Sequence, residues 1–214
     1  MANTKNIMIV GVGGQGTLLA SRILGAAVIH EGYDVKVSEV HGMSQRGGSV
    51  VTYVKYGEQV NAPIIDKGEA DIILAFERLE ALRALPYLRK GGKIILNDRA
   101  ILPMPVITGA AEYPQNILGY LSERADLTAL DALKLSEQAG SAKAVNVVLI
   151  GVLAQSTNIN YAVWQKIICE TVPEKFKELN LRAFDLGYHY HSTGGITMAE
   201  QKNIKTVKAC SAVY

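Results

Sequence analysis

Short apolar segments alternate with longer segments of helical spacing along most of the chain. The apolar segments are rich in β-branched residues and end in glycine or polar clusters, which is typical of buried strands. They predict strands at 6–10, 34–40, 49–56, 70–76, 93–97 and 127–130. Apolar residues at helical spacing predict helices at 15–31, 77–88, 117–124, 131–138, 142–155, 161–171 and 174–190. Because residues 142–155 are apolar on nearly all sides, we expect that helix to be buried.

The order of these elements predicts the fold class. Strands that alternate with helices indicate an α/β domain with a mostly parallel sheet, in a Rossmann-like three-layer sandwich. The C-terminal part is helix-rich. We expect residues 1–191 to form a single domain, and 192–214 to be a C-terminal tail or arm because periodicity is lost there.

Composition excludes several classes of protein. The 214 residues are 49% hydrophobic and 20% charged, with a formal net charge of +2, so an electrostatic nucleic-acid binder is not expected. The longest apolar run, 144–154, is shorter than the roughly 20 residues that a membrane span needs. Since the N-terminus also lacks the pattern of a signal peptide, we expect a cytoplasmic protein that does not bind membranes.

The metal-binding side chains are few and scattered. Cys169 and Cys210 are the two cysteines, and no CxxC pair is present, so the chain by itself cannot ligate an iron–sulfur cluster or a structural zinc. We expect both to be free thiols, as in a reducing cytoplasm. His189 and His191 have no acidic or cysteine companion nearby and are expected at a helix end. The sequence therefore predicts no metal site in this chain; that it also has no catalytic residue is an expectation that rests on the resemblance described below.

A glycine-rich loop follows the first strand and precedes the first helix. The segment GVGGQG satisfies G-x-G-x-x-G, whose glycines let backbone N–H groups approach a phosphate at a helix N-terminus. Glu39, at the end of the second strand, stands near the position of a ribose-binding acid. The same loop also suits tight packing without a ligand. The loop residues proposed to face an anion are Gly11, Gly13, Gly14, Gln15 and Gly16.

A second polar loop, HGMSQRGG, lies between the second and third strands. Its hydroxyl, amide and guanidinium donors suit binding of an anion or of another chain's backbone, although a solvated surface turn is an alternative. In a βαβ unit both loops leave the carboxyl ends of adjacent strands, so we expect them in one crevice. Alternatively, the arginine pairs with Glu39 or Asp71 to fix the loop. The proposed site residues here are Ser44, Gln45, Arg46 and Gly47.

These two strings together resemble a known family. GVGGQG, the following ASRILG at 20–25, and HGMSQRGG at 41–48 are similar to the gamma domain of 2-oxoacid:ferredoxin oxidoreductases. Within that family the HGMSQRGG string is most similar to the beta subunits of members that act on indolepyruvate. The similarity continues weakly through 71–77, 92–97 and 146–151, so it spans roughly residues 5–190.

The resemblance implies a division of labour. Such enzymes decarboxylate a 2-oxoacid on thiamine diphosphate with Mg, pass two electrons through 4Fe–4S clusters to ferredoxin, and release an acyl-CoA. The resemblance places these cofactors in an alpha subunit, because this chain has neither the cysteines nor a GDG-type thiamine motif. It implies a non-cofactor subunit that is inactive alone and faces CoA or its partner. The substrate remains open between indolepyruvate, phenylpyruvate and a close relative.

Two other functions remain as alternatives. The GxGxxG motif is compatible with an NAD(P)-binding Rossmann-type oxidoreductase, although no substrate domain and no Tyr-x-x-x-Lys pair follow it. A non-catalytic nucleotide-sensing protein is the other. We also expect the helices within 142–190 to expose an apolar surface for a partner, or for a homodimer of the isolated chain, because they contain more apolar residues than one-sided packing needs.

Overall fold

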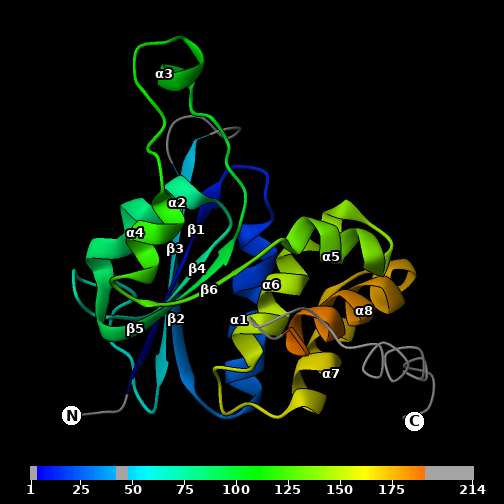
Figure 1. Ribbon diagram of the computed structural model, residues 1–214. Coiled ribbons are helices and arrows are strands. Elements are labelled where there is room, and N and C mark those ends of the chain that lie inside the picture. The colour runs from blue at the N-terminus through cyan, green and yellow to red at the C-terminus, as the bar shows by residue number, and fades with distance from the viewer. Residues whose placement is uncertain (1–3, 42–47, 191–214) are drawn as a thin grey trace.

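The computed structural model describes residues 4–41 and 48–190, which form a sheet with helices on both faces (Figure 1). The sheet has six strands in the order β2-β3-β1-β4-β5-β6. β1, β4, β5 and β6 are parallel, whereas β3 is antiparallel to both of its neighbours. The predicted mostly parallel α/β sheet is therefore confirmed. The strands are β1 (Lys5–Val12), β2 (Asp34–His41), β3 (Ser49–Gly57), β4 (Ala70–Ala75), β5 (Leu88–Asn97) and β6 (Asp126–Leu130).

The position of β3 corrects one prediction. β3 folds back on β2 and lies between β2 and β1. β1 and β2, which precede the two polar loops, were expected to be adjacent, and they are not. Alternate residues of β3 are buried, and its second edge pairs with the whole of β1 from Lys5 to Val12. Alternating burial is typical of an antiparallel strand with one face toward the core, and the pairing of both edges gives β3 its central position.

Helices cover both faces of the sheet in three layers. On one face, a core cluster joins Ile7 and Ile9 of β1 to α1, α5, α6, α7 and α8; on the other, Met8 and Val10 pack with α2 and α4. The longer helices are α1 (Thr17–His30), α2 (Arg78–Ala84), α4 (Ile117–Ser122), α5 (Ala132–Ala139), α6 (Val145–Ala154), α7 (Tyr161–Thr171) and α8 (Lys177–Tyr188). The short ones are α3 (Met104–Ile107), η1 (Leu85–Tyr87), η2 (Ala142–Ala144) and η3 (Glu174–Phe176).

Helix α6 is buried, as predicted, and packs closely against α8. A Cβ on Gly151 would lie 2.3 Å from the carbonyl oxygen of Phe184, and a Cβ on Gly187 would lie 2.0 Å from that of Val148. Only glycine allows the two backbones to approach this closely. The crossing of α6 and α8 therefore depends on this pair of glycines.

The predicted apolar surface on the C-terminal helices is wrong. In the described part of this region, Phe176 is the one large apolar side chain that is exposed. The apolar residues of α6 are covered by α1 and the sheet on one side and by α5 and α8 on the other, so no excess remains. Cys169 is disulfide-bonded, so the expectation of a free thiol there is also wrong; Cys210 lies outside the described residues.

Two further local features concern the start of β5 and the segment that follows it. Gly91 and Gly92 lie inside β5, where its register with β4 shifts between Ala70 and Ile72, rather than at the end of a helix. After β5 the chain leaves the body at 98–116, with α3 at the end of this excursion (Figure 1).

Candidate functional site

The glycine loop connects the carboxyl end of β1 to the start of α1. Gly16 has φ +84°, and a Cβ there would lie 2.7 Å from Nδ2 of Asn146. A Cβ on Gly11 would lie 2.9 Å from Oε1 of Gln15 and 3.0 Å from Cβ of Phe76. Gly14 has φ +95°, but a Cβ there would meet no atom of the described residues within 4 Å. Gly11 and Gly16 are thus required by packing, whereas Gly14 lies at the open side of the loop.

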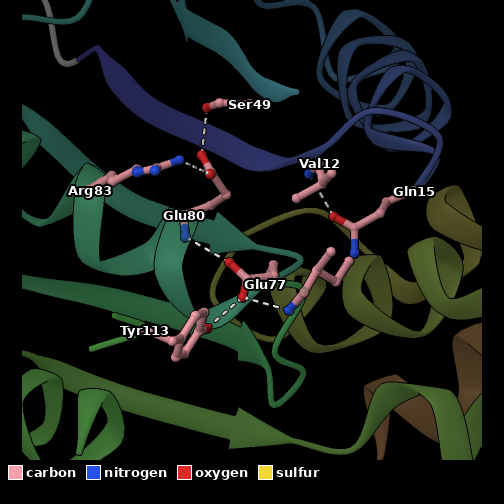
Figure 2. A network of polar contacts seen from close by, with 8 residues as sticks. Val12, Gln15, Ser49, Glu77, Glu80, Arg83 and Tyr113 are labelled. Carbon is pink, nitrogen blue, oxygen red and sulfur yellow. Dashed lines mark hydrogen bonds and ion pairs between the residues drawn. The ribbon is translucent and has the colours of Figure 1, made fainter. Parts of the chain in front are cut away.

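Gln15 braces the loop from inside. Its Oε1 accepts a hydrogen bond from the backbone N–H of Val12 at 2.7 Å (Figure 2). Its Nε2 donates to the carbonyl of Phe76 at 3.1 Å. Asn97 donates to the same carbonyl at 3.2 Å and accepts from the backbone N–H of Ala132 at 3.1 Å. Side-chain amides therefore join the ends of β1, β4 and β5. The amide of Gln15 is used within the protein, and a ligand would meet the backbone of this loop instead.

The start of α1 offers backbone donors rather than side chains. Gly16 is its N-cap, and no side chain of the described residues caps the first turn. Such a helix start has free N–H groups and the positive end of the helix dipole. The first turn contains no acidic residue that would oppose a bound anion. The loop therefore suits recognition of a phosphate or carboxylate, and its geometry gives no acid–base chemistry.

The two predicted loops meet at this end of the sheet, as far as the described residues show. The backbone N–H of Gly13 donates to the carbonyl of Gly48 at 2.9 Å, which joins the glycine loop to the segment just before β3. Gly11, Gly13, Gly14, Gln15 and Gly16 therefore lie together beside Gly48. Ser44, Gln45, Arg46 and Gly47 lie outside the described residues, so their part in the site stays a prediction.

Two buried carboxylates lie at the start of α2 and form a network of hydrogen bonds. Glu80 of α2 accepts a hydrogen bond from the hydroxyl of Ser49, the first residue of β3, at 2.5 Å, and its other oxygen accepts from Arg83 at 2.6 Å (Figure 2). The carboxylate of Glu77 accepts from the backbone N–H of Glu80 at 2.9 Å and caps α2. These contacts fix the start of α2 to the start of β3.

Glu77 also holds the base of the 98–116 excursion. The side chain is buried, and one of its oxygens accepts both the backbone N–H of Ile101 at 3.0 Å and the hydroxyl of Tyr113 at 2.7 Å. Burial, together with this hydrogen bond, raises the pKa of Tyr113, so its hydroxyl stays a donor at neutral pH. One buried carboxylate thus binds the outgoing and the returning arm of the excursion.

The position of Glu39 disagrees with an NAD-binding arrangement. Glu39 lies opposite Thr52 of β3, whose hydroxyl donates to it at 3.1 Å. Because β3 separates β2 from β1, Glu39 is two strands from the glycine loop, about 10 Å at the usual strand spacing. In a dinucleotide-binding fold the acidic residue follows a strand adjacent to the first. The NAD(P) alternative loses this part of its support.

Sequence reasoning missed the residues that connect the elements of this site. Glu77, Asn97 and Asn146 all end or interrupt apolar runs, and all three are buried. Asn146 donates to the carbonyl of Gly16 at 3.4 Å, from a helix 130 residues away in sequence. A polar residue at the end of a buried strand is a signal that was available for the first two. No group of metal-binding side chains occurs within 4–41 and 48–190.

None of the helices in the described ranges is long and apolar enough to cross a bilayer.

Comparison with known proteins identifies relatives of the whole domain. The family described as pyruvate ferredoxin/flavodoxin oxidoreductase matches residues 6–190. The indolepyruvate oxidoreductase subunit IorB of Pyrococcus horikoshii is 45% identical over 188 residues, which cover 85% of this chain and 93% of that protein. Among solved structures, the gamma subunit of a keto/oxoacid ferredoxin oxidoreductase from Geobacter sulfurreducens has a TM-score of 0.63 at 25% identity and covers 86% of this chain and 96% of its own.

The same fold also occurs within a longer chain. The 2-oxoglutarate:ferredoxin oxidoreductase of Magnetococcus marinus, solved with 2-oxoglutarate, coenzyme A and succinyl-CoA bound, matches 86% of this chain but 30% of its own length, with a TM-score of 0.66. At 17% identity this likeness concerns the fold alone.

Proposed function

The chain belongs to the pyruvate ferredoxin/flavodoxin oxidoreductase family and is a subunit of a 2-oxoacid:ferredoxin oxidoreductase; from this premise we propose that its complex acts on indolepyruvate or a closely related arylpyruvate. The observation that supports this substrate most strongly is the 45% identity, over nearly the full length, to a subunit named for indolepyruvate. In the proposed reaction an arylpyruvate and CoA yield an arylacetyl-CoA and CO2, while two electrons reduce ferredoxin.

We further propose that thiamine diphosphate, Mg and the 4Fe–4S clusters are bound by an alpha subunit. A 4Fe–4S cluster takes four thiolates, and this chain has two cysteines, of which Cys169 is already disulfide-bonded. The donor set of the chain does not fit a cluster. The isolated chain is therefore expected to be inactive, and ferredoxin is expected to bind through the complex. We place this complex in the cytoplasm.

The role proposed for this chain is recognition of an anion at the carboxyl end of the sheet. Backbone N–H groups at the start of α1 and the open side of the loop at Gly14 support an anion site beside Gly48. Arg46, together with Ser44, Gln45 and Gly47, is proposed to complete it. The anion is either a phosphate of CoA or a carboxylate of the alpha subunit.

One alternative role of Arg46 is weakened by the position of Asp71. That carboxylate lies near the amino end of β4, at the opposite end of the sheet from the glycine loop, and already accepts hydrogen bonds from Arg89 at 2.7 Å and from the backbone of Asn6 at 2.8 Å. Glu39 therefore remains as the one proposed carboxylate partner through which Arg46 would fix the 41–48 loop.

The experiment is reconstitution with the alpha subunit. We expect arylpyruvate- and CoA-dependent reduction of a viologen dye only when both subunits are present. In the complex, Arg46→Ala should leave the melting temperature unchanged and lower acyl-CoA formation or the affinity for the alpha subunit. A lower melting temperature with unchanged turnover and affinity would assign Arg46 to loop structure instead.

A further inference from the structure

The excursion at 98–116 is unusual because it is well formed and yet almost entirely outside the protein body. It leaves the carboxyl end of β5, and α3 lies at its far end (Figure 1). None of the residues from Arg99 to Asn116 is buried. Segments this exposed are normally polar, since water solvates them.

This excursion is apolar instead. Leu102, Met104 and Ile107 are 49%, 66% and 61% exposed, respectively, and they lie within six positions of one another. From Arg99 to Asn116 the charged residues are Arg99 and Glu112. Clustered apolar exposure rimmed by few charges is typical of a surface that another molecule covers.

Hydrogen bonds hold the excursion both at its tip and at its base. Within it, backbone hydrogen bonds close the turn of α3, including those from Ile107 and Thr108 to the carbonyls of Pro103 and Met104 at 3.1 and 2.9 Å. At its base, Glu77 binds both arms through Ile101 and Tyr113. Such preorganisation lowers the entropy lost on binding.

We propose that this excursion is the docking arm for the alpha subunit, and that Leu102, Met104 and Ile107 enter an apolar groove on that subunit. The proposal rests on the proposed function, which supplies the partner. Two observations favour this occupant over a second copy of the chain.

The first observation is the shape of the arm. A stable dimer buries about 800 Å² on each partner. Two tips built around the four-residue helix α3 would meet over far less surface than that. A tip that enters a groove is contacted on several sides, so a larger partner of complementary shape makes better use of it.

The second observation is the longer chain that shares this fold. In the Magnetococcus protein the fold makes up 30% of the chain, so it is covalently joined to a much larger part of the same enzyme. The arm also leaves the same end of the sheet as the glycine loop, and Glu77, Glu80 and Ser49 connect the two regions. One subunit bound there would meet both.

The experiment compares two matched triple variants in binding to the purified alpha subunit. Leu102→Ser/Met104→Ser/Ile107→Ser removes the apolar tip. The control replaces apolar side chains of similar exposure elsewhere on the surface, namely Ile29, Ile64 and Phe176, which are 59%, 61% and 45% exposed, with serine. All six positions are exposed, so both variants should fold, which circular dichroism and thermal melting check.

We expect the tip variant to bind the alpha subunit at least tenfold more weakly than the wild type, and the control to bind within twofold. Dye reduction by the tip variant should recover when the alpha subunit is added at saturating concentration, because the arm assembles the complex and takes no part in the chemistry. Equal affinity of the tip variant and the wild type, or equal loss in the control, would overturn the docking role while leaving the proposed function intact.

Two other outcomes also count against the docking role. If light scattering shows a wild-type dimer that only the tip variant abolishes, the occupant is a second copy. If the wild type neither binds the alpha subunit nor supports dye reduction with it, the proposed function fails, and the docking role fails with it.

Discussion

Replacing Glu77 with glutamine tests whether one buried carboxylate anchors the 98–116 excursion. Glu77 is 1% exposed and accepts hydrogen bonds from the backbone of Glu80, the backbone of Ile101 and the hydroxyl of Tyr113. In Glu77→Gln the amide oxygen keeps the bonds from Ile101 and Tyr113 but loses the ionic contribution, about 1 kcal/mol for each bond. The amide NH2 then faces the N–H of Glu80, so the cap of α2 is lost, which costs about 1 kcal/mol more.

The expected loss is therefore about 3 kcal/mol in the free energy of unfolding, or roughly 6–12 °C in Tm for a domain of this size. Urea unfolding followed by circular dichroism measures it. The control is Glu123→Gln, because Glu123 is 71% exposed and pairs with Arg124 on the surface; its effect should stay below about 0.5 kcal/mol.

Limited trypsin digestion separates an anchor from general instability. Well below the melting temperature, cleavage after Arg99 in the outgoing arm should be faster in Glu77→Gln, while cleavage after Lys175 in η3 should be unchanged. A variant that unfolds within 0.5 kcal/mol of the wild type and is cut at Arg99 at the wild-type rate would refute the anchor role of Glu77.

Three further predictions concern the core and the glycine loop. Gly151→Ala should destabilise the protein by about 3 kcal/mol or more in urea unfolding, since its Cβ would overlap α8. The control Gly25→Ala, at a helical position with open space, should be neutral or stabilise by up to about 1 kcal/mol. Equal effects of the two substitutions would contradict the close crossing of α6 and α8. Burial raises the pKa of Asp185, in α8, above 3.8, so the wild type should lose stability as the pH rises from that value through the folded-state pKa. Asp185→Asn should lack this loss of stability in urea unfolding at several pH values. Parallel pH profiles of the variant and the wild type would argue against this role of Asp185. Gly16→Ala should lower Tm by several degrees because of its positive φ and the clash with Asn146, and an unchanged Tm would show that the loop adapts.

The sequence predicted the elements better than their arrangement. Alternation along 49–56 identified β3, and the apolar run at 142–155 identified a buried helix, because burial on one or all sides leaves a local pattern. Local pattern does not determine which strands are neighbours. The insertion of β3 between β2 and β1 depends on pairing across the sheet, and it separated Glu39 from the glycine loop.

The candidate site shows the same limit at the level of side chains. The glycine positions were predicted, but Gln15 was expected to face a ligand, whereas its amide is bonded to Val12 and Phe76. Its direction depends on the end of β4, which lies 61 residues away. Exposed apolar residues were expected to cluster on the C-terminal helices, but packing between those helices buries them. A cluster occurs on the excursion, which no helix or strand of the described residues covers.

The central claim is that this chain is an obligatory, cofactor-free subunit of an arylpyruvate:ferredoxin oxidoreductase. The most direct measurement is indolepyruvate- and CoA-dependent viologen reduction by this chain alone, by the alpha subunit alone and by the two mixed, with acyl-CoA identified by mass spectrometry. The account predicts no iron and no activity in this chain, and indoleacetyl-CoA formation by the mixture well above that of the alpha subunit. Activity of the alpha subunit that is unchanged by this chain, or dye reduction by this chain alone, would contradict it.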